Sequence, residues 1–363
     1  MKISAALTRV PQDPFTVEEL DIEAPRAAEI LVRLVASGVC HTDLVTKQLL
    51  PSGVPFVLGH EGAGVVEEVG QDVTGIRPGD KVLLSYRSCG ACGHCRSGHP
   101  TYCEQFRALN SSGTRPVDGS TTLSQAGQPV LGSFFGQSSF ATYVIATPDN
   151  AVVVPQDTDL RSAAPLGCSI QTGAGAVLNV LRPQETARVV IYGAGGVGLA
   201  ALMAAKASGA AAIVAVDPVP SRRELALKLG ATAVVDPAVG DVVEAVRAHT
   251  GGGATHALDT TAVPTVIAQG VKALAARGTL VAIGLGASEV TVDITDLIAN
   301  GKTLRGCIEG DAVPHQFLPR LLELRAQGLL PVEELITFYP FTEINQAVAD
   351  SVSGLVIKPV LLF

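Results

Sequence analysis

The sequence predicts a two-domain α/β protein, in which an antiparallel, barrel-like unit is followed by a parallel sheet that helices cover on both faces. At 363 residues the chain is long for one domain and long enough for two hydrophobic cores. Up to about residue 155, short runs of Val, Ile and Leu are separated by glycine, a pattern typical of antiparallel strands. From about residue 187, apolar strands alternate with helical segments, and repeated βα units build parallel sheets.

In the first part, residues 30–35 and 64–70 are the clearest predicted strands. Residues 107–139 are rich in Ser, Thr, Gly and Pro and have few periodic apolar positions, so we expect a long loop there. Long loops in compact domains are often functional. The apolar run at 356–363 is expected to rejoin this first unit.

The second part has a regular rhythm of strand and helix. Its predicted strands cover residues 188–192, 212–216, 233–235, 256–259 and 279–283. Its predicted helices cover residues 196–208, 221–229 and 241–249, and a later helix is predicted at 315–326. This alternation predicts a doubly wound sheet.

The composition excludes several classes of function. With 47% hydrophobic and 17% charged residues, the chain fits a soluble globular protein. A formal net charge of −8 argues against nucleic-acid binding, which needs clustered Lys and Arg. Residues 1–9 lack the apolar core of a secretory signal, so we expect a cytoplasmic protein. Residues 189–205 carry no charge, but their glycines favour a buried strand, turn and helix over a membrane span.

A glycine-rich motif joins the first strand of the second part to its helix. Residues 193–198 read Gly-Ala-Gly-Gly-Val-Gly, a complete G-x-G-x-x-G. The first glycine permits a tight turn, the second lets the backbone approach a pyrophosphate, and the third allows close helix packing. The phosphate charge then rests on the helix N-terminus. The sequence therefore predicts a Rossmann-type dinucleotide site at Gly193, Gly195, Gly196, Val197 and Gly198.

An acidic residue follows the next strand. Asp217 comes nineteen residues after Gly198, at a position where a carboxylate accepts hydrogen bonds from the adenosine ribose. This favours NAD, because the 2′-phosphate of NADP would meet a like charge. The neighbouring Arg222 and Arg223 can accommodate such a phosphate, so NADP stays open.

Six of the seven cysteines fall into two groups. Cys89, Cys92, Cys95 and Cys103 follow a C-x2-C-x2-C-x7-C pattern, and four thiolates suit a closed, structural zinc site. Cys40 and Cys168 lie far outside this cluster, with His60 between them in sequence. Two thiolates and one imidazole leave a fourth position for water or substrate, as catalytic zinc requires.

Other interpretations of the cysteines stay open. The four-cysteine lobe is compatible with two disulfides or an iron–sulfur cluster, although short spacing in a cytosolic chain favours zinc. His94 and His99 lie inside the lobe and compete as ligands. Cys40 or Cys168 alone would more often be a core thiol, and we expect Cys307, which has no partner pattern, to be one.

These motifs together resemble a zinc-dependent alcohol dehydrogenase of the medium-chain dehydrogenase/reductase family. The resemblance covers essentially the full length and depends on segments 38–43, 59–70, 89–103, 166–168 and 193–198, which occur in the family's order. It implies a GroES-like β-barrel catalytic domain at 1–170 and 308–363 and a Rossmann NAD-binding domain at 171–307. It also implies two zinc ions per subunit, with Cys40, His60 and Cys168 as catalytic ligands and the lobe cysteines as structural ligands.

The resemblance implies further roles beside the catalytic zinc. Asp43 would hold the zinc-bound imidazole of His60, and Glu61 would lie beside the metal. Thr42 would take the substrate proton as the first member of a relay. Many relatives continue this relay through a histidine at the position of Val45, and valine cannot carry a proton. His41 as a substitute is a hypothesis.

The resemblance places three more residues near the cofactor. Thr172 would pack against the nicotinamide face, while His41 and Lys358 would contact the pyrophosphate. Four side chains are candidate liners of an apolar substrate pocket, namely Tyr86, Phe106, Phe134 and Leu297.

The pattern is similar to the aryl and benzyl alcohol dehydrogenases of the family, so we expect oxidation of an aromatic or allylic primary alcohol with NAD. One alternative is a glutathione- or mycothiol-linked formaldehyde dehydrogenase, for which the loop at 107–120 offers only Arg107 and Arg115. Another is a nonenzymatic NAD-binding redox sensor. We expect no nucleic-acid or membrane partner and a homodimer or homotetramer.

Overall fold

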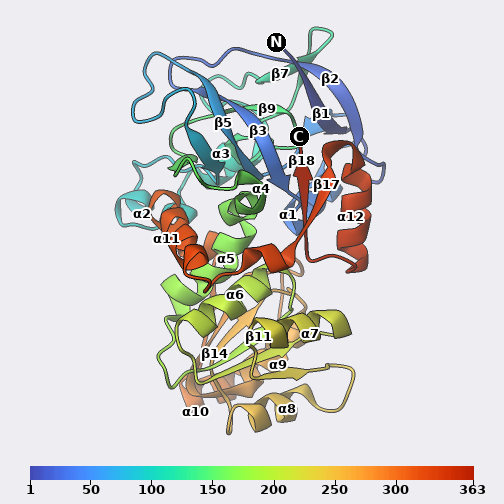
Figure 1. Ribbon diagram of the computed structural model, residues 1–363. Coiled ribbons are helices and arrows are strands. Elements are labelled where there is room, and N and C mark those ends of the chain that lie inside the picture. The colour runs from blue at the N-terminus through green and yellow to red at the C-terminus, as the bar shows by residue number, and fades with distance from the viewer. The chain divides into compact units, whose positions relative to one another are not determined.

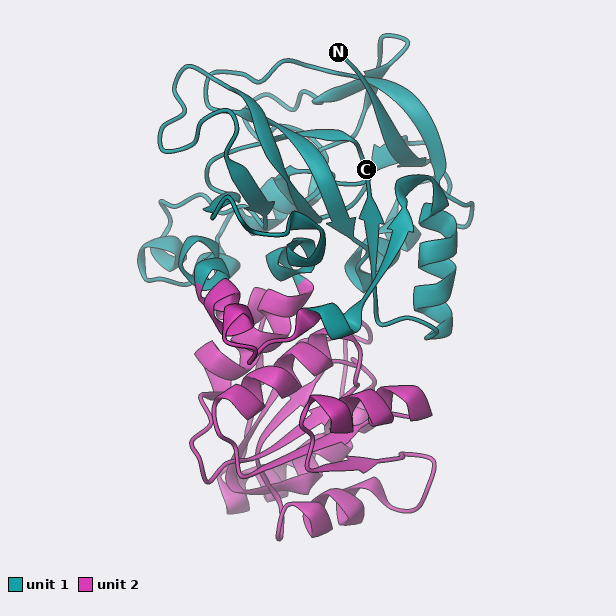
Figure 2. Ribbon diagram, in the orientation of Figure 1, with its two compact units in different colours: residues 1–168, 313–319, 333–363 teal, residues 169–312, 320–332 magenta.

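The computed structural model describes all 363 residues and divides into two compact units (Figure 2). Unit 1 comprises residues 1–168, 313–319 and 333–363, and unit 2 comprises residues 169–312 and 320–332. The division crosses helix α11 (Pro314–Ala326). Residues 169–170, 308–312 and 320–332 group with unit 2, whereas the domain bounds taken from the sequence place them in the first domain.

Unit 1 contains two sheets, and the smaller one is antiparallel throughout its named strand pairs. Its strand order is β4-β1-β2-β7-β8. The strands are β4 (Phe56–Val57), β1 (Lys2–Thr8), β2 (Thr16–Ile22), β7 (Leu123–Gln125) and β8 (Gln128–Val130).

The larger sheet of unit 1 has the order β10-β6-β5-β3-β18-β17, with β9 also paired to β3. Its strands are β10 (Ala151–Val154), β6 (Lys81–Leu84), β5 (Glu61–Val69), β3 (Ile30–Gly38), β18 (Lys358–Leu362), β17 (Ile336–Pro340) and β9 (Tyr143–Ala146). Figure 1 shows red β18 beside blue β3, and their antiparallel register pairs Leu361 with Ser37. The predicted return of the C-terminal run to the first unit is confirmed.

Short helices connect these sheets. They are α1 (His41–Leu49), α2 (Gly93–Arg96), α3 (Phe106–Ser111), α4 (Leu160–Ala163) and α12 (Ile344–Ser353), with 3₁₀ turns at Pro100–Tyr102, Phe134–Gly136, Ala164–Gly167, Val332–Leu335 and Phe341–Glu343. A single apolar core links both sheets, because the inward residues of β1, β3 and β5 pack with Phe56, Phe134 and Phe140. Burying large aromatic side chains contributes about 2 to 3 kcal/mol each.

Unit 2 is a six-stranded parallel sheet with the order β13-β12-β11-β14-β15-β16. Its strands are β11 (Arg188–Tyr192), β12 (Ala212–Val216), β13 (Ala233–Val235), β14 (Ala254–Asp259), β15 (Leu274–Ala282) and β16 (Thr303–Gly306). This is the doubly wound order, in which the chain reverses direction across the sheet between β11 and β14. The Rossmann-type prediction is confirmed.

Helices follow the strands of unit 2. They are α5 (Ser169–Gly175), a π-helical turn at Ala176–Leu181, α6 (Gly196–Ala207), α7 (Pro220–Leu229), α8 (Val242–His249), α9 (Pro264–Ala273) and α10 (Ile294–Asn300), with a 3₁₀ turn at Glu309–Asp311. The predicted strand–helix rhythm matches to within one residue at β11, α6, β12 and α7, where apolar runs are bounded by glycine or proline.

One expectation needs correction. The segment 107–139 is not one structureless loop, since it contains most of α3 together with β7 and β8. These elements are too short to create a periodic apolar pattern, so the sequence alone did not predict them. The strand, turn and helix predicted for the uncharged stretch 189–205 are confirmed, since β11, a turn and α6 cover this stretch. No helix anywhere in the chain has the length and apolar character of a membrane span.

Candidate active site and metal centres

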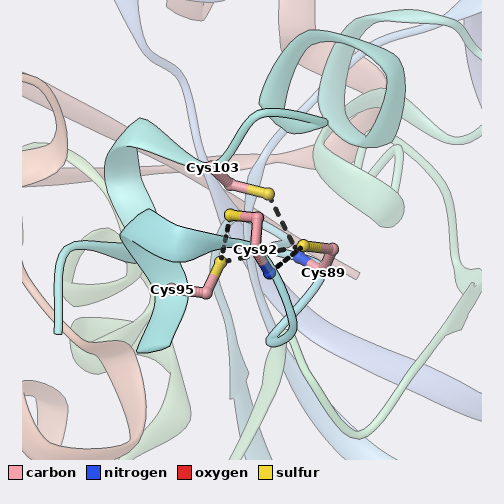
Figure 3. Close-up of side chains that lie close together, drawn as sticks. All are labelled: Cys89, Cys92, Cys95 and Cys103. Carbon is pink, nitrogen blue, oxygen red and sulfur yellow. Dashed lines mark hydrogen bonds between the residues drawn. The ribbon is translucent and has the colours of Figure 1, made fainter. Parts of the chain in front are cut away.

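The four cysteines of the lobe converge at one point (Figure 3). Cys95 Sγ lies 3.4 Å from Cys92 Sγ and 3.9 Å from Cys89 Sγ, and all four cysteines are free thiols. Tetrahedral zinc with bonds near 2.3 Å holds its sulfur ligands about 3.8 Å apart. The spacing therefore fits one zinc ion, and the disulfide interpretation is wrong for this structure.

Backbone amides donate hydrogen bonds to the sulfur atoms of this cluster and so favour the thiolate form that binds a cation. Cys92 N–H donates to Cys89 Sγ at 3.3 Å, and Cys89 N–H donates to Cys103 Sγ at 3.3 Å. Backbone hydrogen bonds from Cys95 and Glu104 lower the pKa of Cys92 to about 6, whereas burial raises the pKa of Cys95 to about 12. Thiolates are the form that binds metal. Neither His94 nor His99 belongs to the set of converging ligand atoms.

A second group of metal-ligating side chains lies within unit 1. The ligand atoms of Cys40, His60, Glu61 and Cys168 all lie within 4.8 Å of one another. Cys40 precedes α1, His60 and Glu61 stand where β5 begins, and Cys168 follows the 3₁₀ turn at 164–167. Three segments distant in sequence thus supply the two thiols and the imidazole that the sequence predicted to meet.

His60 is fully buried, and its two ring nitrogens have different environments. Nδ1 lies 2.8 Å from Asp43 Oδ1, while Nε2 is buried without a hydrogen-bond partner. A carboxylate on Nδ1 fixes the ring so that Nε2 presents its lone pair to a metal. The unpartnered nitrogen therefore fits a zinc ligand, and burial without one would cost free energy.

Asp43 is fully buried and organises the start of α1 as well as His60. Its carboxylate accepts from Cys40 N–H and Gly59 N–H, both at 3.0 Å. One side chain thus fixes the backbone beside two of the predicted ligands. Hydrogen bonding with Cys168, supported by the charges of Lys358 and His60, lowers the pKa of Cys40 well below its usual value.

Lys358 lies in β18 and is almost completely buried. Its ammonium donates to Glu61 Oε1 at 2.8 Å and to the Val39 carbonyl at 3.0 Å. Burial raises the pKa of Glu61, and the positive charge of Lys358 opposes that shift. The structure therefore pairs Lys358 with Glu61, the carboxylate of the second metal-ligating group. The predicted contact of Lys358 with the pyrophosphate stays a prediction.

The first turn of α1 carries His41 and Thr42. Thr42 Oγ1 lies 3.8 Å from Cys40 Sγ, so its hydroxyl borders the predicted catalytic metal site, whereas His41 is exposed. A cavity of about 510 Å³ lies beside this helix, lined by residues 11–15, by His41 and Val45, and by part of α12.

The glycine turn of unit 2 has the geometry that the motif predicts. Gly193 has φ +91°, and a Cβ on Gly198 would lie 1.8 Å from the Gly193 carbonyl, so both positions require glycine for the fold itself. A Cβ on Gly195 or Gly196 would meet nothing within 4 Å. Glycine at these two positions leaves open space at the N-terminus of α6, which fits a pyrophosphate.

Asp217 follows β12 and is 2% exposed. Its oxygens accept from Ala194 N–H at 2.7 Å and from Val219 N–H at 2.8 Å. Arg222 Nη1 lies 4.0 Å from the same carboxylate, and its buried Nε has no hydrogen-bond partner. Arg223 pairs with Asp236 at 2.7 Å and donates to the backbone carbonyl of Asp217 at 2.8 Å. Arg222 is therefore the arginine that lies at the Asp217 carboxylate, while Arg223 contacts the backbone of the same residue.

Comparison with known proteins connects both units to one family. Residues 26–156 match the alcohol dehydrogenase GroES-like domain, and residues 196–326 match the zinc-binding dehydrogenase domain. The geraniol dehydrogenase of Castellaniella defragrans is 48% identical over 99% of this chain and 97% of its own length. The chain belongs to the zinc-dependent alcohol dehydrogenases of the medium-chain family.

Two further relatives show the range of this family. The crystal structure of benzyl alcohol dehydrogenase from Acinetobacter calcoaceticus is 42% identical, with a TM-score of 0.96, and covers 100% of this chain and 99% of its own. A probable S-(hydroxymethyl)glutathione dehydrogenase of Schizosaccharomyces pombe is 36% identical over 94% of this chain and 92% of its own length. This alcohol dehydrogenase is thus an oxidoreductase that acts on small-molecule alcohols.

Aromatic side chains surround the imidazole of His60 in the alcohol dehydrogenase. Phe135 lies 4.6 Å from it between ring centroids and Phe134 lies 5.5 Å away. Phe106 lies 6.3 Å from Phe135 and 5.6 Å from Tyr86. The structure thus brings together Tyr86, Phe106 and Phe134, whereas Leu297 packs with the core of unit 2.

Sequence reasoning missed two residues of this alcohol dehydrogenase. Phe135 is the aromatic ring nearest to His60, and its φ of +51° is unusual for a bulky residue. No sequence motif signals it. Glu309 is 7% exposed, and its Oε2 accepts from Thr172 Oγ1 at 3.4 Å, which connects it to a predicted cofactor residue. The motif G-C-I-E-G-D contained a signal, because an acidic residue within an apolar and glycine-rich stretch is often buried for a reason.

Arg115 bears on the thiol-linked alternative. Its guanidinium is buried and pairs with Glu29 at 2.6 Å and with Glu23 at 2.7 Å. Arg115 therefore has a structural role within unit 1. Arg107, on the exposed side of α3, is the other arginine of the loop at 107–120.

Proposed function

We propose that this alcohol dehydrogenase oxidises a primary alcohol of aromatic or allylic type to the aldehyde, and catalyses the reverse reaction, with NAD as the hydride acceptor. The supporting observation is the ring of aromatic side chains around His60. Phe135 packs on the imidazole at a tilt, with 32° between the ring planes, while Phe134 approaches edge-on at 89°. Flat π-systems pack well against such walls, in offset or edge-to-face geometry.

The relatives support the same substrate class. The geraniol dehydrogenase acts, by its name, on an allylic alcohol, and the Acinetobacter enzyme on a benzylic one. Both alcohols place an sp² carbon beside the carbinol. The aromatic wall of this chain suits that shared chemistry, since an apolar pocket with few polar groups selects by shape.

In this proposal Cys40, His60 and Cys168 hold the catalytic zinc, and the four lobe cysteines hold the structural zinc. A zinc ion held at the first site would polarise the alcohol oxygen and make its proton easier to remove. Asp43 fixes the His60 ring for this task, and Lys358 neutralises Glu61 beside the site. Thr42 accepts the substrate proton at its hydroxyl oxygen.

The proton then needs a route past Val45. We place His41 next in that route, because it is exposed and lies on the same cavity wall as Val45. An imidazole titrates near neutral pH and exchanges protons with solvent. His41 is therefore suited to replace the histidine that many relatives carry at the position of Val45.

In this proposal unit 2 would bind NAD, with Gly195 and Gly196 holding the pyrophosphate and Asp217 the adenosine ribose. A carboxylate at the ribose disfavours the 2′-phosphate of NADP. Arg222 reduces that discrimination, since its side chain lies at the same carboxylate.

The alternatives have weaker support. A thiol-linked formaldehyde dehydrogenase needs cationic groups for its carrier, and Arg115 is already paired with Glu29 and Glu23. A nonenzymatic redox sensor has no need for a complete set of catalytic ligands, yet Cys40, His60 and Cys168 converge.

The test is a panel of aliphatic, allylic, aromatic and thiol-adduct alcohols, assayed with NAD and NADP on protein of measured zinc content. We expect about two zinc ions per subunit and a higher kcat/KM for benzyl and allylic alcohols than for ethanol. Phe135→Ala should reduce this preference about tenfold. Phe338→Ala is the matched control, because Phe338 is 45% exposed on β17. Preference for a thiol adduct, or turnover without zinc, would overturn the proposal.

We further propose a cytoplasmic homodimer or homotetramer. The run 279–285, at the end of β15, is apolar and is a candidate for joining subunits. Light scattering during size-exclusion chromatography distinguishes the two assemblies from a monomer.

A further inference from the structure

A strained segment follows β16 in unit 2. Glu309 and Asp311 have φ +49° and Gly310 has φ +67°, so three consecutive residues adopt left-handed backbone conformations. For a residue other than glycine this conformation is unfavourable, and such strain persists only where the surroundings impose it. Strained backbone of this kind clusters at ligand sites.

The surroundings hold this segment tightly. Asn179 Nδ2 donates to the Gly310 carbonyl at 3.0 Å, and a Cβ on Gly310 would lie 2.4 Å from the Gln171 carbonyl. A Cβ on Gly175 would lie 2.5 Å from the Gly310 carbonyl. Helix α5 and the π-helical turn after it therefore pack directly on the backbone of residues 309–311.

This packing fixes the carboxylate of Glu309. Its Oε2 accepts from Gln171 Nε2 at 3.2 Å and from Thr172 Oγ1 at 3.4 Å. Gln171 is fully buried and Thr172 half-buried, so the carboxylate lies just beneath the surface. Two donors on one oxygen suit the ionised form. Burial raises the pKa of Cys307 to about 12, and the negative charges of Asp311 and Glu309 act in the same direction.

The sheet topology indicates what this carboxylate faces. In a doubly wound sheet the dinucleotide crosses the carboxyl ends of the strands at the reversal of strand order, with one nucleotide on each side. The Gly193 turn and Asp217 assign the adenosine half to the ends of β11 and β12. The nicotinamide half therefore belongs to the ends of β14, β15 and β16, and Glu309 follows β16 by three residues.

Asp259, at the end of β14, is the other buried carboxylate at this edge. It accepts from Thr261 Oγ1 at 2.7 Å and from Ala262 N–H at 3.0 Å, so it serves the turn that follows its own strand. Glu309 instead connects to a half-buried hydroxyl on another element. Of the two carboxylates, Glu309 is therefore the one that Thr172 would connect to a ligand bound at this edge.

We propose that Glu309 is a positioning residue that makes the alcohol dehydrogenase favour the oxidised over the reduced nicotinamide. The inference depends on the proposed use of NAD. The oxidised ring carries one positive charge, which disappears when a hydride and its electron pair are added. A fixed negative charge nearby therefore stabilises the oxidised form selectively. This preference assists alcohol oxidation, because the oxidised cofactor binds well and the reduced one leaves readily.

The test measures dissociation constants for NAD and NADH by titration calorimetry, without turnover. Because the chain has no tryptophan, NADH fluorescence gives an independent second value. Glu309→Gln keeps the shape and removes the charge, so the ratio Kd(NAD)/Kd(NADH) should rise about tenfold. Glu185→Gln is the charge control, because Glu185 is exposed in the turn before β11, at the opposite end of the strands.

A purely structural role for Glu309 would weaken both cofactors equally and leave the ratio unchanged, which would overturn the inference. If Glu309→Gln fails to fold, Glu309→Gly carries the test, because glycine relieves the left-handed strain while removing the carboxylate. Wild-type protein that binds neither cofactor would refute the proposed function, and the inference with it. Wild-type binding with an unchanged ratio in the variants would refute the inference alone.

Discussion

Asp43 holds three donors around the predicted catalytic zinc, so Asp43→Asn should release that metal selectively. The carboxylate accepts from the His60 ring at 2.8 Å and from two backbone N–H groups at 3.0 Å. Each hydrogen bond to a buried charged group contributes about 1.5 to 3 kcal/mol. The amide oxygen of the variant side chain can still accept some of these hydrogen bonds. Its NH₂ group, however, would face one of the three donors and cannot accept a hydrogen bond from it.

The expected result follows from these contacts. Loss of the carboxylate behind a zinc-bound imidazole costs about 10- to 100-fold in metal affinity. Both proteins are dialysed against a series of chelators of increasing strength. Elemental analysis should then find that the variant retains the structural zinc and loses the catalytic one under conditions in which wild type keeps both. Activity should fall with the metal and recover partly in excess zinc.

Asp80→Asn is the matched control. Asp80 is also nearly buried and accepts a backbone N–H, from Arg77 at 3.0 Å, but it has no place among the metal-ligating side chains. Its variant should retain both zinc ions. Equal zinc retention by the Asp43 variant and wild type across the whole chelator series would refute the reasoning.

Three further changes test other parts of the molecule. Because His41 is proposed to complete the proton route, Val45→His should leave the pH dependence of kcat unchanged, and an altered profile would indicate that the route past Val45 is incomplete. Asp217→Ala should weaken NAD about tenfold and improve NADP in kcat/KM, whereas equal loss with both cofactors would indicate a damaged turn. Arg115→Met should lower the free energy of unfolding by about 3 kcal/mol, because it leaves the buried Glu29 unpaired. Burial raises the pKa of Glu29, but the pairing with Arg115 outweighs this effect and lowers that pKa. The pair therefore stabilises the fold above the usual carboxyl pKa and loses its effect as the pH falls. Chemical denaturation of wild type and variant at pH 7 and pH 4 measures the free energy of unfolding under both conditions.

The sequence predicted those parts of the fold that local chemistry determines. β11, β12 and α6 have apolar runs bounded by glycine, and the structure reproduces their bounds to within one residue. The glycine turn was predictable for the same reason, since Gly193 and Gly198 each satisfy a separate steric requirement. The elements within 107–139 were not, because β7 and β8 are only three residues long and depend on partners elsewhere in the sheet.

The metal-ligating groups show the same limit. Spacing alone brings Cys89 and Cys92 together, because a short loop cannot separate them. The meeting of Cys40, His60 and Cys168 depends on the fold of unit 1, and only a pattern of several segments predicts it. The contact between the Phe135 ring and His60 could not be predicted from the sequence, since the left-handed backbone of Phe135 results from the surrounding packing.

Lys358 illustrates what a motif position leaves undetermined. Its place in the chain suggested a phosphate contact, yet β18 pairs with β3 and carries the ammonium to Glu61 and the Val39 carbonyl. A buried lysine remains charged only where acceptors and a carboxylate compensate for the lost hydration, and Glu61 supplies that compensation. The same pairing keeps the Glu61 carboxylate engaged beside Cys40 and His60. The lysine thus acts on the metal site through Glu61, and that dependence follows from a contact between residues 297 positions apart, which no local pattern encodes.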